Sequence, residues 1–151
     1  MMRLLSLLAR MPAAERRALT SAFVWCTVAS VVLKVVPFRT VAARLGRTQL
    51  GTAGDAAESP MSREDSAVVR RVAWAVSRAA RWLPWKPVCL PQAVTAQWML
   101  RRSGVPSTLY LGIDPNGSYD AHAWVRAGRV IVTGGPSVQR YAVVAAFASA
   151  A

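Results

Sequence analysis

Two side chains in the second half of the sequence could carry out covalent catalysis together. They are Cys89 and His122, the only histidine of the chain. A thiol that attacks a carbonyl, with an imidazole as its base, is the chemistry of cysteine hydrolases and acyltransferases. A free cysteine is often only a small buried hydrophobe. The catalytic interpretation therefore depends on local structure that would make the thiol reactive.

The residues around Cys89 indicate that it begins a helix. Apolar side chains recur at helical spacing between residues 90 and 100. Pro91 is tolerated only in a first turn, and Gly104 suits a C-terminal cap. The unpaired N–H groups and the dipole at a helix N-terminus favour a thiolate. The sequence therefore predicts a reactive thiol at Cys89.

His122 is predicted to lie on a strand of a small antiparallel sheet. Apolar and polar residues alternate over residues 107–113 and again over 120–126, and residues 129–133 return as a third strand. On the middle strand, Asp120 shares a face with His122. Helices that precede the strands along the chain indicate an α+β fold.

Three residues are candidates for orienting the imidazole of His122. If Ala127–Gly128 is a two-residue hairpin loop, Thr133 stands opposite His122 and its hydroxyl could hold the ring. Asp120 lies two residues from His122 on the same strand, and Asp114 lies on the preceding turn. We favour Asp120, because a carboxylate also stabilises the imidazolium.

Donors for an oxyanion hole are expected beside Cys89. One is the backbone N–H of Cys89 itself, and the other is the indole N–H of Trp82 or Trp85 in the preceding loop. Simple packing is the alternative explanation for these tryptophans. No glutamine lies shortly upstream of Cys89, so a side-chain donor of the papain kind is missing.

Composition excludes several other kinds of site. The chain has 151 residues and is 54% hydrophobic, which suits one domain with a substantial core. Its two cysteines and one histidine are too few for a four-ligand structural zinc site, and we expect no metal or cofactor. Cys26 lies in an apolar segment and is expected to be a core residue. Only two carboxylates follow residue 65, which disfavours a paired-carboxylate hydrolase.

The first 50 residues are predicted to be helical. Met2–Leu8 is apolar, a long segment from about Pro12 ends at Pro37, and residues 38–45 suit a short basic helix. The long segment has hydroxyl side chains and fewer apolar residues than a membrane span needs. We therefore expect a core helix rather than a membrane-associated one. No secretion signal is evident, and a cytoplasmic location is expected.

A change of composition suggests an internal boundary. Residues 51–62 are polar and small, as in a linker, and a helix from about Ser62 to Arg81 follows. We place a helical segment with its linker at residues 1–60 and the catalytic core at residues 61–151, within one compact domain.

These residues together resemble a known family. The resemblance covers most of the chain and rests on residues 36–39, 44–46, 89–106, 109–113 and 121–125. They are similar to the lasso peptide biosynthesis B protein, in its stand-alone leader-peptidase form, whose core is similar to transglutaminases. The family implies N-terminal helices followed by a transglutaminase-like or papain-like core, with the catalytic helix packed on a small antiparallel sheet.

The resemblance also implies an activity and partners. The activity is a cysteine protease that removes the leader from a ribosomally made lasso precursor through a thioester on Cys89. The partners are the precursor peptide, a separate leader-binding protein and an ATP-dependent cyclase resembling asparagine synthetase. Transglutaminase-like enzymes take an aspartate from the strand after the histidine, and no carboxylate lies there in this sequence.

The net charge of +12 leaves three other classes of function open. They are a transglutaminase-like acyltransferase acting on an amine, a basic protein at a membrane surface, and a nucleic-acid-binding module. No nucleic-acid-binding motif or dense basic run supports the last class, so we expect no nucleic-acid partner. We interpret the charge as serving an acidic partner or leader peptide.

Overall fold

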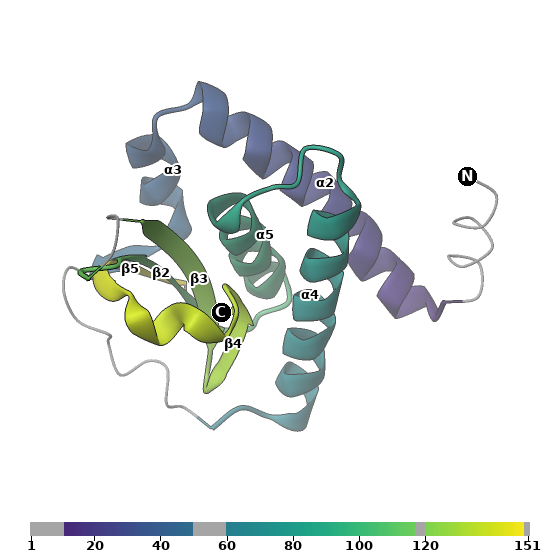
Figure 1. Ribbon diagram of the computed structural model, residues 1–151. Coiled ribbons are helices and arrows are strands. Elements are labelled where there is room, and N and C mark those ends of the chain that lie inside the picture. Colours follow the sequence, from purple (N-terminus) through teal and green to yellow (C-terminus); the bar gives the residue numbers. More distant parts are fainter. Residues whose placement is uncertain (1–10, 50–59, 117–119, 150–151) are drawn as a thin grey trace.

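The computed structural model describes residues 11–49, 60–116 and 120–149. Its elements, in chain order, are α2 (Ala13–Val35), α3 (Phe38–Leu45), β1 (Arg47–Gln49), α4 (Arg63–Trp82), α5 (Cys89–Arg102), β2 (Ser107–Ile113), β3 (Ala121–Ala127), β4 (Val130–Thr133), the 3-10 helix η2 (Pro136–Arg140) and β5 (Ala142–Ser149). Figure 1 shows α5 between the sheet on one side and helices α2 and α4 on the other.

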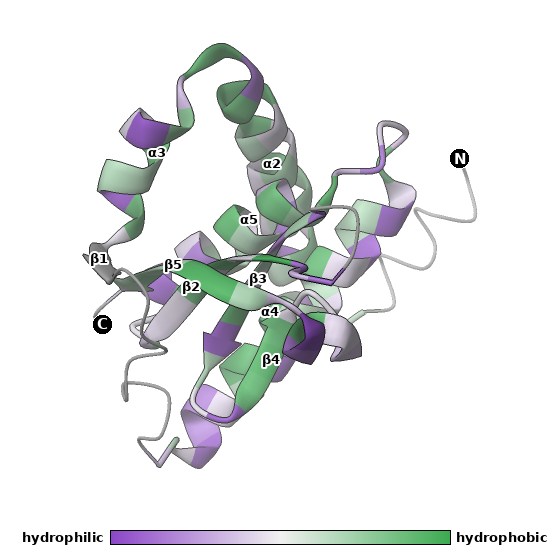
Figure 2. Ribbon diagram, turned by 60° about the vertical axis from the view of Figure 1, so that its left-hand side comes forward, coloured by the Kyte–Doolittle hydropathy of each residue, from purple (hydrophilic) through white to green (hydrophobic). Residues whose placement is uncertain are grey.

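The sheet has five strands in the order β1-β5-β2-β3-β4, and every neighbouring pair is antiparallel. Helix α5 packs against β2, β3 and β4, while α2 and α4 pack against α5 and against each other. Figure 2 shows hydrophobic residues along α5, β2 and β4, where these layers meet. The predicted α+β class, with a helix that begins at Cys89 on an antiparallel sheet, is confirmed.

Helix α4 forms where the sequence predicts it. The Ser62 hydroxyl accepts a hydrogen bond from the Asp65 backbone N–H at 3.0 Å, and acidic residues fill the first turn. Apolar residues at helical spacing turn one face of α4 inward: Val69, Val72, Ala75, Val76 and Ala79. This buried face packs α4 against α5.

Helix α2 ends just before Pro37 and buries one face. The buried residues are Leu19, Ala22, Cys26 and Ala29, and the opposite face exposes Val24, Val28, Val31 and Val35. Within the described residues, α2 is the one helix long and apolar enough to cross a membrane, by length and composition. Its buried face packs against α4 and α5, and therefore contributes to the common core.

The structure corrects the sequence analysis at three places. Residues Arg47–Gln49 form strand β1 on the edge of β5, so the first 50 residues are not wholly helical. Strand β5 was not predicted, although it joins β1 to the rest of the sheet. The β3–β4 hairpin has a different register, described below. The apolar stretch Met2–Leu8 and most of the linker lie outside the described residues.

Candidate active site

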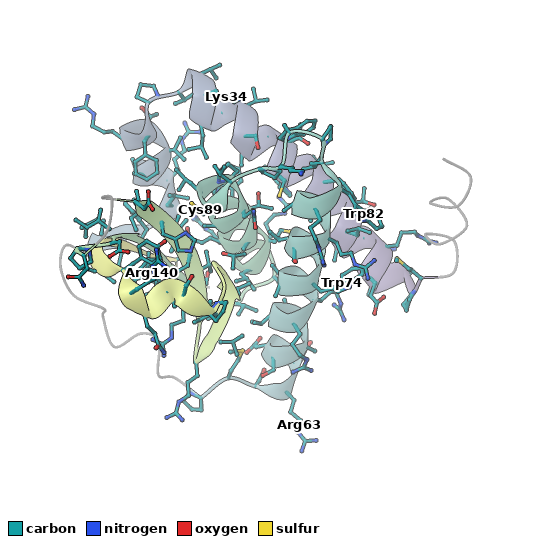
Figure 3. All side chains as sticks on the ribbon, viewed as in Figure 1. Lys34, Arg63, Trp74, Trp82, Cys89 and Arg140 are labelled. Atoms are coloured by element: carbon teal, nitrogen blue, oxygen red, sulfur yellow. The ribbon has the colours of Figure 1, made fainter. Side chains whose placement is uncertain are left out.

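Cys89 and His122 line the same cavity, although helix α5 and strand β3 are far apart in the sequence. The cavity is about 440 Å³ and is lined by Ala73, Ser77, Cys89, Gln92, His122, Ile131, Val132, Thr133, Gly134 and Gly135. Both side chains are half-buried. Figure 3 labels Cys89 between α5 and the sheet. Because α5 packs across β3 and β4, its first residue and His122 reach the same cavity.

The start of α5 leaves hydrogen-bond donors free near the thiol. Val88 is the N-cap residue in an extended conformation, and no side chain caps the helix. Pro91 has no N–H, so the backbone N–H groups of Cys89 and Leu90 are the donors of this first turn. These donors and the helix dipole stabilise negative charge on Sγ or on an oxyanion beside it.

The imidazole of His122 is held by a backbone carbonyl. Nε2 lies 2.9 Å from the carbonyl oxygen of Gly134. A carbonyl oxygen only accepts hydrogen bonds, so Nε2 carries the proton and Nδ1 of the neutral ring has the free lone pair. Within the described residues, no hydrogen bond joins this ring to the Cys89 thiol. Catalytic hydrogen bonds often tighten only when substrate binds.

Gly134 can present this carbonyl because it is glycine. Its φ is +107°, which disfavours any L side chain. A Cβ on this residue would collide with the Trp124 Cβ and would lie 3.3 Å from the His122 Nε2. The main chain therefore approaches the ring closely at a position where a side chain does not fit.

Two aromatic rings flank the imidazole. The Tyr141 ring is stacked on it, with centroids 4.8 Å apart and planes at 29°, and the Trp124 ring lies 6.1 Å away at 25°. Aromatic faces attract cations, by about 0.5–1 kcal/mol at exposed sites and more when desolvated. The rings therefore favour the imidazolium that forms when His122 accepts a proton.

Within the described residues, no hydrogen bond or ion pair joins any of the three predicted orienting residues to His122. Asp120 is exposed, and no described hydrogen bond or ion pair joins its carboxylate to His122. The Asp114 carboxylate pairs with Arg140 at 3.3 Å and accepts the Asn116 backbone N–H at 3.0 Å. Asp114 therefore fixes the turn and η2.

The predicted hairpin register was wrong. Ala127 pairs with Val130, so the loop is Gly128–Arg129, and a bulge shifts the register further between Val125 and Arg126. Thr133 consequently pairs with Val125 and not with His122. Its hydroxyl is buried and has no hydrogen-bond partner among the residues that the structure describes, and Thr133 lines the cavity.

Of the predicted oxyanion donors, the two tryptophans lie away from the cavity that Cys89 lines. Trp82 packs on Phe23 with ring centroids 6.0 Å apart, and Trp85 lines a different cavity next to Leu33. Neither is among the residues around the cavity of Cys89 and His122. The backbone N–H of Cys89 is the predicted donor that adjoins the thiol.

Gln92 was not predicted to belong to the site, although it lines the cavity. Its Nε2 donates to the Pro87 carbonyl at 2.7 Å, which ties the first turn of α5 to the preceding loop. Residues three apart lie on the same helix face. Its position three residues after Cys89 was the signal that could have found it.

Cys26 has no place in this site. It is fully buried in α2, and burial raises the pKa of its thiol, an effect only partly opposed by a hydrogen bond with Thr95. A protonated, enclosed thiol is a poor nucleophile. The predicted core role of Cys26 is confirmed.

One comparison with known proteins identifies the superfamily of this chain. The transglutaminase-like superfamily matches residues 32–146, a range that includes Cys89, His122 and Gly134. Comparison with curated proteins and with solved structures gives no significant match. The superfamily match extends from the end of α2 into β5 and so covers most of the chain. The chain belongs to the transglutaminase-like superfamily.

Proposed function

We propose that this protein is a cysteine peptidase that removes the leader from a lasso peptide precursor. The observation that carries the peptidase activity is the common cavity of Cys89 and His122 in a chain of the transglutaminase-like superfamily. The resemblance of residues 89–125 to the leader-peptidase form of the lasso peptide B protein supports the narrower substrate.

The proposed reaction follows from the hydrogen bond of His122. With Nε2 donating to Gly134, Nδ1 accepts the proton of the Cys89 thiol. The thiolate attacks the carbonyl carbon at the leader–core junction, and the backbone N–H of Cys89 stabilises the oxyanion. His122 then gives its proton to the leaving amine, the C–N bond breaks, and the core peptide departs.

Water completes the cycle. His122 takes a proton from a water molecule, whose oxygen attacks the thioester carbon. The C–S bond breaks, the thiolate recovers a proton, and the leader leaves with a new carboxyl group. The carbonyl of Gly134 and the rings of Tyr141 and Trp124 hold the imidazolium in place of an acidic residue, so the enzyme works as a Cys–His dyad.

Partners and location belong to the same proposal. The precursor is brought by a separate leader-binding protein, and the released core passes to an ATP-dependent cyclase, all in the cytoplasm. A leader held by a linked partner reaches the active site at high effective concentration. This protein by itself is therefore expected to cleave slowly.

The test is cleavage of a lasso precursor, with and without a leader-binding partner, followed by mass spectrometry. We expect a leader that ends in a free carboxyl group, faster cleavage with the partner, and loss of cleavage in Cys89→Ala. Repeating the reaction with an added primary amine separates hydrolysis from acyl transfer. A leader joined to the amine as the main product, or full activity in Cys89→Ala, would refute the peptidase.

A further inference from the structure

A second cavity lies on the other side of α4 from the active site. It is about 680 Å³ and is formed by the first half of α2, the middle of α4 and the end of α5. Its lining residues are Ala14, Arg17, Ala18, Ser21, Trp25, Val68, Arg71, Val72, Met99, Arg102 and Ser103. We call it the arginine cleft. The proposed reaction uses none of these residues.

Three guanidinium groups surround the arginine cleft. Arg17 comes from α2, Arg71 from α4 and Arg102 from α5. Within the part of the chain that the structure describes, none of them has a carboxylate within ion-pair distance. Glu15 is the nearby acid, and it lines an adjoining hollow with Arg70 and Arg71. Positive groups of this kind repel one another until an anion lies between them.

Apolar side chains form part of the lining of the arginine cleft. Val68, Val72 and Met99 line it together with Trp25, and the Arg102 guanidinium lies 5.9 Å from the Trp25 ring centre. Stacking on the indole holds this guanidinium in one direction. The cleft thus combines apolar side chains with positive charge, which matches a ligand that has both apolar and acidic groups.

We propose that the arginine cleft binds an acidic, partly apolar segment of the peptide substrate. That the segment belongs to the substrate rests on the proposed function. A nucleic acid is disfavoured because the Trp25 indole already contacts two neighbours: the Arg102 guanidinium lies over its ring, and Trp98 meets it in a T-shaped arrangement. A hollow between three helices also suits side chains better than a flat lipid surface.

The geometry sets how far this segment lies from the cleaved bond. Cys89 and Arg102 are the first and last residues of α5, which has 14 residues and so spans about 20 Å. An extended peptide covers about 3.3 Å per residue. A side chain of the bound segment that contacts Arg102 therefore lies about six residues from the cleaved bond, and further if the peptide passes around α4.

The test measures binding apart from cleavage. The protein is Cys89→Ala, and the probe is a short fluorescein-labelled peptide in which glutamate and leucine alternate. Control probes replace every glutamate with glutamine, or with lysine. Fluorescence anisotropy at two salt concentrations should show binding of the glutamate peptide, weaker at high salt, and little binding of the controls.

Matched variants locate the binding site. Arg17→Gln, Arg71→Gln and Arg102→Gln together should weaken binding at least about tenfold, because three charged contacts of roughly two- to fivefold each are lost. Arg63→Gln, Arg81→Gln and Arg129→Gln remove the same charge from residues that do not line the cleft, and binding should stay within about twofold. Replacing the three cleft arginines with lysine keeps the positive charge, so this variant should bind the peptide more tightly than the glutamine variant does. Such a difference would show that the glutamine variant binds weakly because it has lost charge.

Several outcomes would overturn the proposal. They are equal weakening by the two sets of variants, equal binding of the glutamine peptide, or preferred binding of a single-stranded oligonucleotide or an anionic vesicle. The proposed function fails separately. If the peptide binds in the cleft but the wild-type chain never cleaves a precursor, the peptidase is wrong while the cleft remains an acidic-peptide site.

Discussion

Replacing Gly134 with alanine should slow the reaction of the proposed catalytic pair, although Cys89 and His122 are themselves unchanged. The new methyl group would meet the Trp124 Cβ, and alanine does not readily adopt a φ of +107°. The main chain must therefore move, and the carbonyl oxygen that lies 2.9 Å from the His122 Nε2 moves with it.

The expected loss follows from the hydrogen bond that is removed. A hydrogen bond to a charged group contributes about 1.5–3 kcal/mol. At 1.36 kcal/mol for each factor of ten, its loss should slow the reaction roughly 10- to 150-fold. Asp120→Asn and Thr133→Val should stay within about threefold of wild type, because neither side chain is bonded to His122 in the described structure.

The assay need not wait for the natural substrate. The rate at which iodoacetamide alkylates Cys89 at neutral pH reports how well His122 accepts the thiol proton. Gly135→Ala is the matched control, since Gly135 also has a positive φ of +72° but a Cβ there meets nothing within 4 Å. Thermal unfolding of each variant shows that it is folded when alkylated.

Two results would contradict this reasoning. If Gly134→Ala reacts as fast as Gly135→Ala, the carbonyl does not hold the imidazole. If Asp120→Asn slows the reaction more than about 100-fold, the exposed carboxylate of Asp120 moves to His122 during catalysis and acts as a triad acid.

Three further predictions use other features of the structure. Iodoacetamide should label Cys89 well before Cys26 in the folded protein, because burial encloses Cys26 and raises the pKa of its thiol; equal labelling in a peptide map would contradict this. Tyr141→Leu should slow Cys89 alkylation about two- to fivefold through loss of the ring stacked on His122, whereas Tyr141→Phe should not, and equal rates would exclude the ring from the site. Leu100→Ala should lower the free energy of unfolding in urea by about 2–5 kcal/mol, since Leu100 is fully buried on α5; a loss under about 1 kcal/mol would mean that the core closes around the gap.

The local sequence determined the elements that carry the chemistry. Pro91 in a first turn and regular apolar spacing place Cys89 at the start of α5, and the structure has the helix there. Alternation over residues 120–126 predicts the strand that holds His122. These signals depend only on neighbours in the chain, so they do not change with the way in which the helices and strands pack.

Contacts between segments far apart in the chain could not be predicted from the sequence. The orienting group of His122 depends on a bulge in β3–β4 and on the main chain at Gly134, and a backbone carbonyl leaves no mark in the sequence. The position of Trp85 is another contact of this kind. Trp85 lies shortly before Cys89 in the chain, yet it lines a different cavity.

The arginine cleft also combines a feature that the sequence predicts with one that only the folded structure shows. Its positive charge was evident from composition, but its three arginines come from three helices, and each looked like an ordinary exposed residue in the sequence. The sequence by itself determined helices α2 to α5, strands β2 to β4 and the places of Cys89 and His122 on them, because propensity, capping and periodicity act over a few residues. The tertiary structure decided which group holds His122 and where the charges converge, because those contacts depend on how whole elements pack.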